Sequence, residues 1–308
     1  MSLSLRSRGL IAVTLWWPLL AQAPENSVIS MDVKRVILHA TVREGKARFV
    51  GDLQKDDFEV LENGVRQEII SFSREDLPVA TGILVDNSRS MMNKQSEVVA
   101  AAKAFVRASN PNDDIFVLHF NERLTYGLPA NIPFTSDHAL LAEALDRTQL
   151  DGRTALYDGI IEALNHLKKS KLTKKALFVI SDGGDNVSRH KAEDAIREAD
   201  VSGALFYAIG IYDEMDGDAK PSVLHSLAQN TGGEAYFPKQ VAEVRKLCET
   251  IARDLRSQYM ISYAPRESSA AGDDYRKIRV RVKDPQGRKL IVRTRTGYYA
   301  RTTTPQEQ

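Results

Sequence analysis

The stretch VATGILVDNSRS, residues 79–90, decides the fold expected for this chain. It opens with a run that contains no charged residue and closes with a carboxylate and two hydroxyls, at Asp86, Ser88 and Ser90. Uncharged, largely apolar runs of this length are typical of strands buried on both faces, as in a parallel sheet covered by helices. Further runs of the same kind occur at residues 115–118, 176–180 and 204–211.

Apolar residues at helical spacing lie between these runs. The spacing is clearest in three sets: Val98, Ala102, Phe105 and Val106; Leu156, Ile160, Ala163 and Leu167; Val244, Leu247, Ile251 and Leu255. Strands that alternate with helices indicate an α/β domain whose sheet is doubly wound and mostly parallel, similar to a Rossmann fold. The pattern predicts that this domain covers residues 76–257.

The two regions that flank the α/β domain have a different hydrophobic pattern, in which apolar residues recur at every second position. The flanks are residues 24–75 and 258–300. Apolar and polar residues alternate from residue 28 in the first flank, as at Val36, Leu38, Ala40 and Val42, and again in the second. Neither flank is long enough to form a stable core alone, but together they approach the roughly 100 residues of an immunoglobulin-like sandwich. We therefore predict that the α/β domain is inserted in, or flanked by, one β-sandwich made from both segments. Two independent β appendages are the alternative.

The C-terminal flank contains a predicted hairpin and many basic residues. Ile278, Val280 and Val282 alternate with lysine and arginine, and Pro285-Gln286-Gly287 provides a turn. This pattern predicts a half-exposed hairpin whose basic side chains lie in solvent, where they discourage edge pairing. The alternative is a basic patch for an anionic envelope polymer or lipid headgroups, and hence an association with the cell envelope.

The N-terminus indicates export. Arg6 and Arg8 precede a mainly apolar run from Leu10 to Leu20, and the small-x-small sequence Ala21-Gln22-Ala23 follows. This order is typical of a secretory signal peptide, and the run is short for a membrane span. We predict that residues 1–23 are removed and that the protein is periplasmic or extracellular. Residues 301–308 are predicted to be a disordered tail.

Charge and cysteine content exclude several classes of function. The 308 residues include 42 basic and 41 acidic side chains, a formal net charge of +1, which becomes −1 without residues 1–23. A balanced, exported chain is not expected to bind nucleic acid. The single cysteine, Cys248, excludes an intramolecular disulfide and a cysteine-based zinc site. Its place on the apolar face of a predicted helix favours a buried, inert thiol.

Three segments provide oxygen ligands in the same structural context. Asp86, Ser88 and Ser90 follow a buried strand, Thr154 precedes a helix, and Asp182 follows another strand. Open α/β sheets bind ligands at the carboxyl ends of their strands, and carboxylates and hydroxyls suit a hard divalent cation. Helix capping explains single residues in this set but not the whole set. Asp185 and Asn186 either shape the site or form an ordinary turn.

These motifs resemble the von Willebrand factor A family and match all five positions of its metal-ion-dependent adhesion site. The resemblance implies a site for Mg²⁺ or Mn²⁺, with Ser88, Ser90 and Thr154 as hydroxyl ligands. Asp86 and Asp182 would act directly or through water. It also implies that the partner is a protein whose exposed Asp or Glu completes the coordination. A segment around Asp57-Phe58-Glu59-Val60 and Glu62-Asn63-Gly64 is similar to bacterial relatives described from acidobacteria.

Two other functions compete with metal-dependent adhesion. An architectural envelope protein would bind through its β flanks and use the metal only for stability. A metal-assisted phosphohydrolase would use the strand-end aspartate as a nucleophile, and the residue two positions later should then be acidic. That residue is Ser88, and no lysine or histidine base is tied to the motifs, so we do not expect an enzyme. His119 lies within a buried run and is predicted to be a core residue.

Overall fold

The computed structural model describes residues 35–45, 48–74, 76–147, 149–211, 220–265 and 274–300. The predicted signal peptide and the predicted C-terminal tail lie outside these residues. Within the described residues, no helix is both long enough and apolar enough to cross a membrane.

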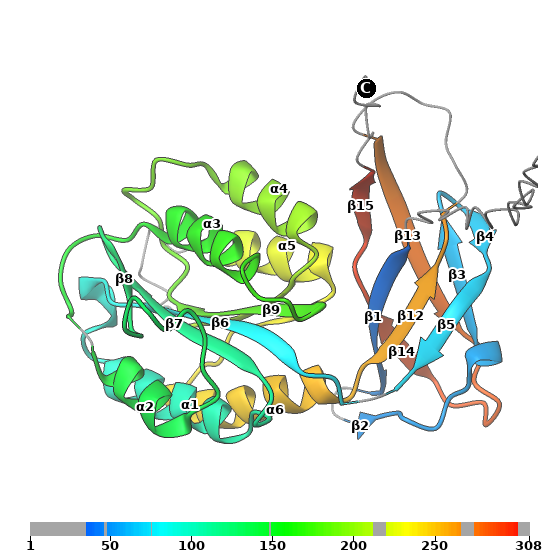
Figure 1. Ribbon diagram of the computed structural model, residues 1–308, viewed down its shortest axis with the longest axis horizontal. Helices are drawn as coiled ribbons and strands as arrows, with labels where there is room; N and C mark the ends of the chain where they lie inside the picture. Colours follow the sequence, from blue (N-terminus) through cyan, green and yellow to red (C-terminus); the bar gives the residue numbers. More distant parts are fainter. Residues whose placement is uncertain are drawn as a thin grey trace, which may run out of the picture. The chain divides into compact units, whose positions relative to one another are not determined.

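A six-stranded sheet forms the centre of the α/β domain (Figure 1). In spatial order its strands are β11 (Ala235–Tyr236), β10 (Leu205–Gly210), β9 (Lys174–Ser181), β6 (Val79–Asp86), β7 (Asp114–Phe120) and β8 (Leu124–Tyr126). All neighbours are parallel except β7 and β8, which are antiparallel. Every residue of β6 is buried, as expected for a central strand covered on both faces.

Helices cover both faces of this sheet (Figure 1). One layer contains α1 (Gln95–Arg107), α2 (His138–Asp146) and α6 (Val244–Arg256), and the other contains α3 (Leu156–Leu167), α4 (Ala192–Ser202) and α5 (Pro221–Thr231). Short 3₁₀ turns η2 (Arg89–Met91) and η3 (Val241–Glu243) precede α1 and α6. The sheet and both layers share one hydrophobic core. The predicted fold class, an α/β domain with a mostly parallel sheet, is confirmed.

Two antiparallel sheets flank the α/β domain, and strands from both ends of the chain pair within them. One sheet has the order β14 (Leu290–Arg293), β1 (Val36–Glu44), β12 (Tyr259–Tyr263) and β5 (Ile69–Ser73), with β2 (Arg48–Phe49) also paired to β1. The other has the order β15 (Gly297–Ala300), β13 (Asp274–Val282), β3 (Phe58–Glu62) and β4 (Val65–Gln67), and η1 (Lys55–Asp57) precedes β3. Leu38, Val60 and Ile261 belong to the core that these strands share.

The predicted hairpin in the C-terminal flank is wrong. The turn forms, and the Gly287 amide donates to the Asp284 carbonyl over 3.1 Å. The strands on its two sides, however, lie in different sheets: β13 pairs with β15 and β3, whereas β14 pairs with β1. Alternation indicates that each segment is a half-buried strand, but it does not specify the partner of that strand.

Lys277, Arg279, Arg281 and Lys283 are exposed as predicted, but two other arginines of this flank are less exposed than predicted. Arg276 forms a buried ion pair with Glu62 over 3.0 Å. Arg288 pairs with Asp52 over 2.9 Å and with Asp284 over 2.7 Å. These arginines are engaged within the fold and do not provide free charge for a basic patch. Alternation with apolar residues could not reveal the pairs with Glu62 and Asp52, because these two partners lie more than 200 residues away in the sequence.

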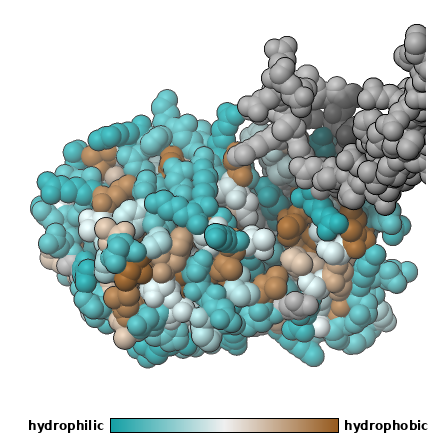
Figure 2. Space-filling view, in the orientation of Figure 1, coloured by the Kyte–Doolittle hydropathy of each residue, from teal (hydrophilic) through white to brown (hydrophobic). Residues whose placement is uncertain are grey.

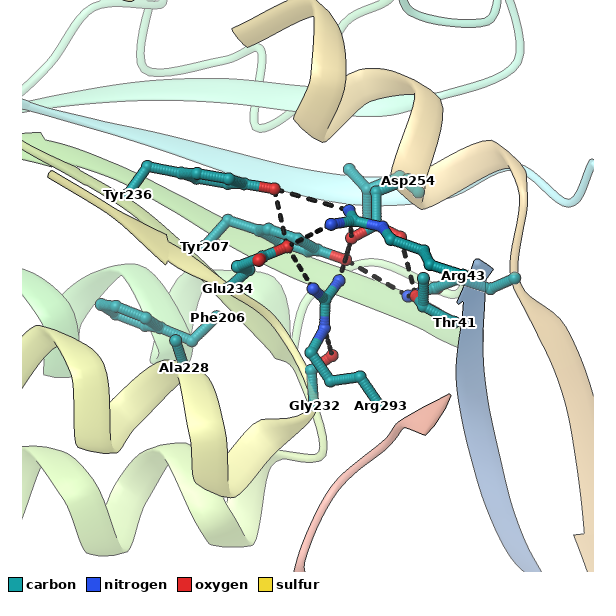
Figure 3. Close-up of polar contacts among 12 residues, drawn as sticks. Thr41, Arg43, Phe206, Tyr207, Ala228, Gly232, Glu234, Tyr236, Asp254 and Arg293 are labelled. Atoms are coloured by element: carbon teal, nitrogen blue, oxygen red, sulfur yellow. Dashed lines mark hydrogen bonds and ion pairs between the residues drawn. The ribbon is translucent and has the colours of Figure 1, made fainter. Parts of the chain in front are cut away.

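A polar cluster joins β1 and β14 to the α/β domain (Figure 3). Thr41 donates a hydrogen bond to Asp254 over 2.7 Å, and Arg43 forms an ion pair with Glu234 over 2.9 Å. Arg293 contacts both carboxylates, Glu234 and Asp254. Thr41 is only 1% exposed, although the alternating pattern places it on the polar side of its strand. The outer face of β1 is therefore covered here by the α/β domain.

Candidate metal centre

The predicted metal ligands lie at the carboxyl edge of the parallel sheet. Asp86 is the last residue of β6, and Ser88 and Ser90 follow it before α1 begins. Asp182 follows β9, which is the parallel neighbour of β6. Thr154 lies two residues before α3. Because neighbouring parallel strands end at the same edge, residues distant in sequence meet there.

Four of the five residues form one chain of hydrogen bonds. The Ser88 amide donates to Oδ1 of Asp86 over 2.9 Å, and the Oγ atoms of Ser88 and Ser90 are 3.0 Å apart. The Ser90 hydroxyl in turn donates to Oδ2 of Asp182. The structure therefore brings together the side chains of Asp86, Ser88, Ser90 and Asp182.

Thr154 lies in a loop that is fixed to both of the other segments. The Arg89 amide donates to the Gly152 carbonyl over 3.3 Å, which ties this loop to the first segment. On the other side, the Thr154 amide donates to Oδ1 of Asn186 over 3.0 Å, and the Asn186 amide returns a bond of 3.0 Å to the Thr154 carbonyl. Among the described residues, the Thr154 hydroxyl makes no hydrogen bond.

The two carboxylates are buried close to each other. Asp86 is fully buried, and Asp182 is 2% exposed. Burial, and then the charge of Asp182, raise the pKa of Asp86 to about 7, although hydrogen bonds from Ser181 and Ser88 oppose the shift. Two desolvated carboxylates that repel each other are the electrostatic environment that a cation would relieve.

The donor set fits a hard divalent cation. It consists of two carboxylates and three hydroxyls and contains neither histidine nor cysteine, a composition that suits Mg²⁺ or Mn²⁺ better than zinc. Throughout the part of the chain that the structure describes, no three His, Cys, Asp or Glu side chains are grouped so as to hold a metal. A metal site here would therefore depend on hydroxyl ligands.

Two further residues support the site: Ser181, which no sequence motif singled out, and Asp185, whose role the sequence left open. The Ser181 hydroxyl donates to Oδ2 of Asp86 over 2.6 Å and so fixes the orientation of this carboxylate. Oδ2 of Asp185 accepts from the Tyr157 amide over 3.1 Å and from the Ser188 hydroxyl over 2.5 Å. Ser181 and Asp185 both flank Asp182 in the sequence. The only signal of these contacts in the sequence is that both residues lie within three positions of Asp182.

His119 lies outside this hydrogen-bonded chain. It is 3% exposed, and its Nε2 lies 2.8 Å from the Ala144 carbonyl. A carbonyl oxygen only accepts, so Nε2 carries the proton. Burial lowers the pKa of His119 and favours the neutral ring. The buried position agrees with the core placement expected from the sequence, but Nδ1 is buried without a hydrogen-bond partner among the described residues.

The fold is that of a known domain class. Residues 81–184 match the family model of the von Willebrand factor type A domain. The chain therefore contains a von Willebrand factor type A domain, here called the A domain. Domains of this class generally act as interaction modules rather than enzymes, often through a metal-ion-dependent adhesion site.

Individual relatives are distant. An uncharacterized protein of Borreliella burgdorferi is 22% identical over 67% of this chain, and the match spans 60% of that relative's length. A von Willebrand factor type A structure from Catenulispora acidiphila covers 79% of this chain and 75% of its own, with 14% identity and a TM-score of 0.53. Proximal thread matrix protein 1 from the mussel byssus, solved with a zinc-occupied adhesion motif, covers 63% of this chain and 49% of its own, with 17% identity and a TM-score of 0.52. At these identities the two structures support the fold alone.

Proposed function

We propose that this is an exported protein that recognises a protein partner through a divalent cation, Mg²⁺ or Mn²⁺. The ligands would be Asp86, Ser88, Ser90, Thr154 and Asp182. An exposed Asp or Glu of the partner would complete the coordination, and the protein would not be an enzyme. The observation that carries this proposal is the hydrogen-bonded chain that joins two buried carboxylates to two serine hydroxyls at the carboxyl edge of the sheet.

The charge of the donor set favours recognition over catalysis. Hydroxyl ligands are neutral, and carboxylates that act through water do not occupy the cation directly. A bound divalent cation would then keep an open position that a carboxylate from outside can fill. The chain's own residues hold the geometry: Ser181 orients Asp86, and Asn186 fixes the loop that carries Thr154. The side chains would therefore be arranged before a partner arrives.

The rest of the chain supports export and polar recognition. The N-terminal sequence has the order of a signal peptide. The face in Figure 2 is hydrophilic over most of the A domain, and its hydrophobic side chains lie in small separate patches. On this face, a partner would find mainly polar groups.

Metal binding is the first test. Isothermal titration of the protein with Mg²⁺, and separately with Mn²⁺, is expected to show one site. Asp86→Asn should weaken that site at least about tenfold, because it removes one of two carboxylates while it preserves shape. Asp151→Asn is the matched control, since Asp151 is an exposed carboxylate near the same edge. Equal affinities for all three proteins would contradict the proposed site.

Carboxylate recognition is the second test. A fluorescent Gly-Ser peptide that contains one Asp should bind in Mg²⁺ and lose binding in EDTA, and its Asn analogue should not bind. Binding that survives EDTA, or that Asp86→Asn leaves unchanged, would favour the architectural alternative, in which the β strands bind the partner. Circular dichroism of Asp86→Asn checks that the variant is folded.

A further inference from the structure

A groove of about 590 Å³ opens beside the candidate metal centre. Asn87, which lies between Asp86 and Ser88, and Gly152, which lies two residues before Thr154, are part of its wall. The opposite wall comes from the β7–β8 turn and from the end of α2. None of the five candidate ligands lines the groove, but two segments of its wall are continuous with the loops that carry them. We call it the Arg123 groove, after the residue discussed below.

Most of the charges that line this groove are already paired. Three acidic residues of the lining each contact a basic side chain: Glu122 with Arg153 over 3.1 Å, Asp146 with Lys103 over 2.6 Å, and Asp151 with Arg89 over 2.7 Å. In addition, Arg147 pairs with Glu143 over 2.7 Å. Within each pair the positive and negative charges cancel, so none of these pairs gives the groove a net charge.

Arg123 is the exception in the described part of this lining. Its side chain is exposed and has no ion pair or hydrogen bond with any described residue. Its backbone is fixed, because its amide donates to Oδ1 of Asn121 over 2.8 Å and its carbonyl accepts from the Asn121 amide over 3.1 Å. The hydrogen bond from Arg89 lowers the pKa of Asp151 and the charge of Arg123 adds to this shift, but the side chains of Arg123 and Asp151 form no direct ion pair. The turn thus holds at the groove a cation that has no direct acidic partner among the described residues.

A lining cation without a direct ion pair complements a peptide segment that carries a carboxylate.

We propose that the Arg123 groove binds the part of the partner chain next to the metal-bound carboxylate, and that a second acidic side chain of this segment pairs with Arg123. The inference rests on the proposed metal-dependent recognition and specifies its partner: an acidic peptide segment with two carboxylates, one for the cation and one for Arg123. A partner surface with a single carboxylate would contact only the cation and not Arg123.

Labelled Gly-Ser peptides test this directly. One peptide carries a single Asp, and a set of others carries a second Asp one to four residues away, with Asn replacing that second Asp in the controls. In Mg²⁺ and low salt, the best diacid should bind the wild-type protein about twofold to fivefold more tightly than its Asn control, the range expected for one exposed ion pair. The difference should shrink in 0.5 M salt, which is about three times physiological ionic strength.

Variants then assign the effect to one residue. Arg123→Gln should abolish the diacid preference and leave mono-acid binding unchanged, and Arg123→Glu should reverse the preference. Arg107→Gln is the matched control, because Arg107 is an exposed arginine at the far end of α1. If no diacid is preferred, or if Arg123→Gln keeps the preference, the groove proposal is wrong. Mono-acid binding that survives EDTA would instead overturn the proposed function itself.

Discussion

Asp200 is a buried carboxyl in α4 that lacks a strong partner. It is 6% exposed, and its Oδ1 has no hydrogen-bond partner among the described residues. Nδ2 of Asn230 reaches its other oxygen over 3.5 Å. Burial raises the pKa of Asp200 to about 6, although the charge of Arg295 opposes the shift. The folded protein therefore binds a proton here more tightly than the unfolded chain does.

This shift predicts a pH-dependent cost to stability. The contribution of the protonated carboxyl is fully present below pH 3.8, the ordinary pKa of an aspartate, and is lost as the pH rises through about 6. Between pH 4 and pH 7.5, the free energy of unfolding of Asp200→Asn should rise by about 1–3 kcal/mol relative to the wild type. Urea unfolding at both pH values measures this change. The exposed Asp56→Asn should show none, and an equal change in both variants would contradict the assignment.

The candidate site shows how far individual residues could be predicted. The positions of Asp86, Ser88 and Ser90 follow from a buried run that ends in a carboxylate and two hydroxyls. The sequence left open whether Asn186 shapes the site or forms an ordinary turn. Its side chain meets the Thr154 amide across 32 positions, and such a meeting depends on where two loops lie in space.

At the scale of elements, α6 is fixed to the β strands through Asp254. This carboxylate is fully buried and accepts from the Thr41 hydroxyl over 2.7 Å and from the Tyr207 hydroxyl over 3.0 Å. Arg43 and Arg293 also contact it. One helix residue thus holds β1, β14 and the central sheet together (Figure 3).

Removal of this carboxylate should destabilise the protein strongly. Asp254→Ala would leave two arginines with Glu234 as their remaining acidic partner and two hydroxyls without their acceptor. We expect the free energy of unfolding to fall by about 3–5 kcal/mol, as when one partner of a buried ion pair is removed. Urea unfolding measures the loss. Glu249→Ala, on the exposed side of α6, should change stability by less than about 0.5 kcal/mol. Similar values for both variants would refute this account.

Element types were predictable where one burial pattern applied along a whole segment. The buried strands of the A domain and the half-buried strands of the flanks have distinct periods, and both appear as expected. The hairpin prediction failed because the turn after β13 sends the chain to another sheet. Periodicity reports which side of a strand is buried, whereas pairing depends on partners that are remote in sequence.

At the scale of the whole molecule, the two flanks depend on each other for hydrogen bonds. β1 pairs with β12 and β14, β5 pairs with β12, and β3 pairs with β13. Each of these pairs joins a strand that precedes the A domain to one that follows it. The proposal that residues 24–75 and 258–300 form a single folding unit rests on these pairs.

The proposed unit predicts that the N-terminal flank cannot fold alone. A fragment of residues 28–75 would keep only the short pairs β1–β2 and β3–β4 and would expose the apolar face of β1. Circular dichroism with urea should therefore show no cooperative unfolding transition, whereas the full chain shows one. A cooperative transition in the fragment would mean that the flanks are independent units.

The sequence by itself determined the α/β class and the five candidate ligands, because burial period and residue chemistry are local properties of the chain. Only the tertiary structure decided which strands of the flanks pair, that Arg276 and Arg293 are held in ion pairs, and that Arg123 lies unpaired in a groove beside the candidate metal centre. These outcomes depend on contacts between segments far apart in sequence. A pattern read along one strand or helix contains no information about which remote side chain will meet it.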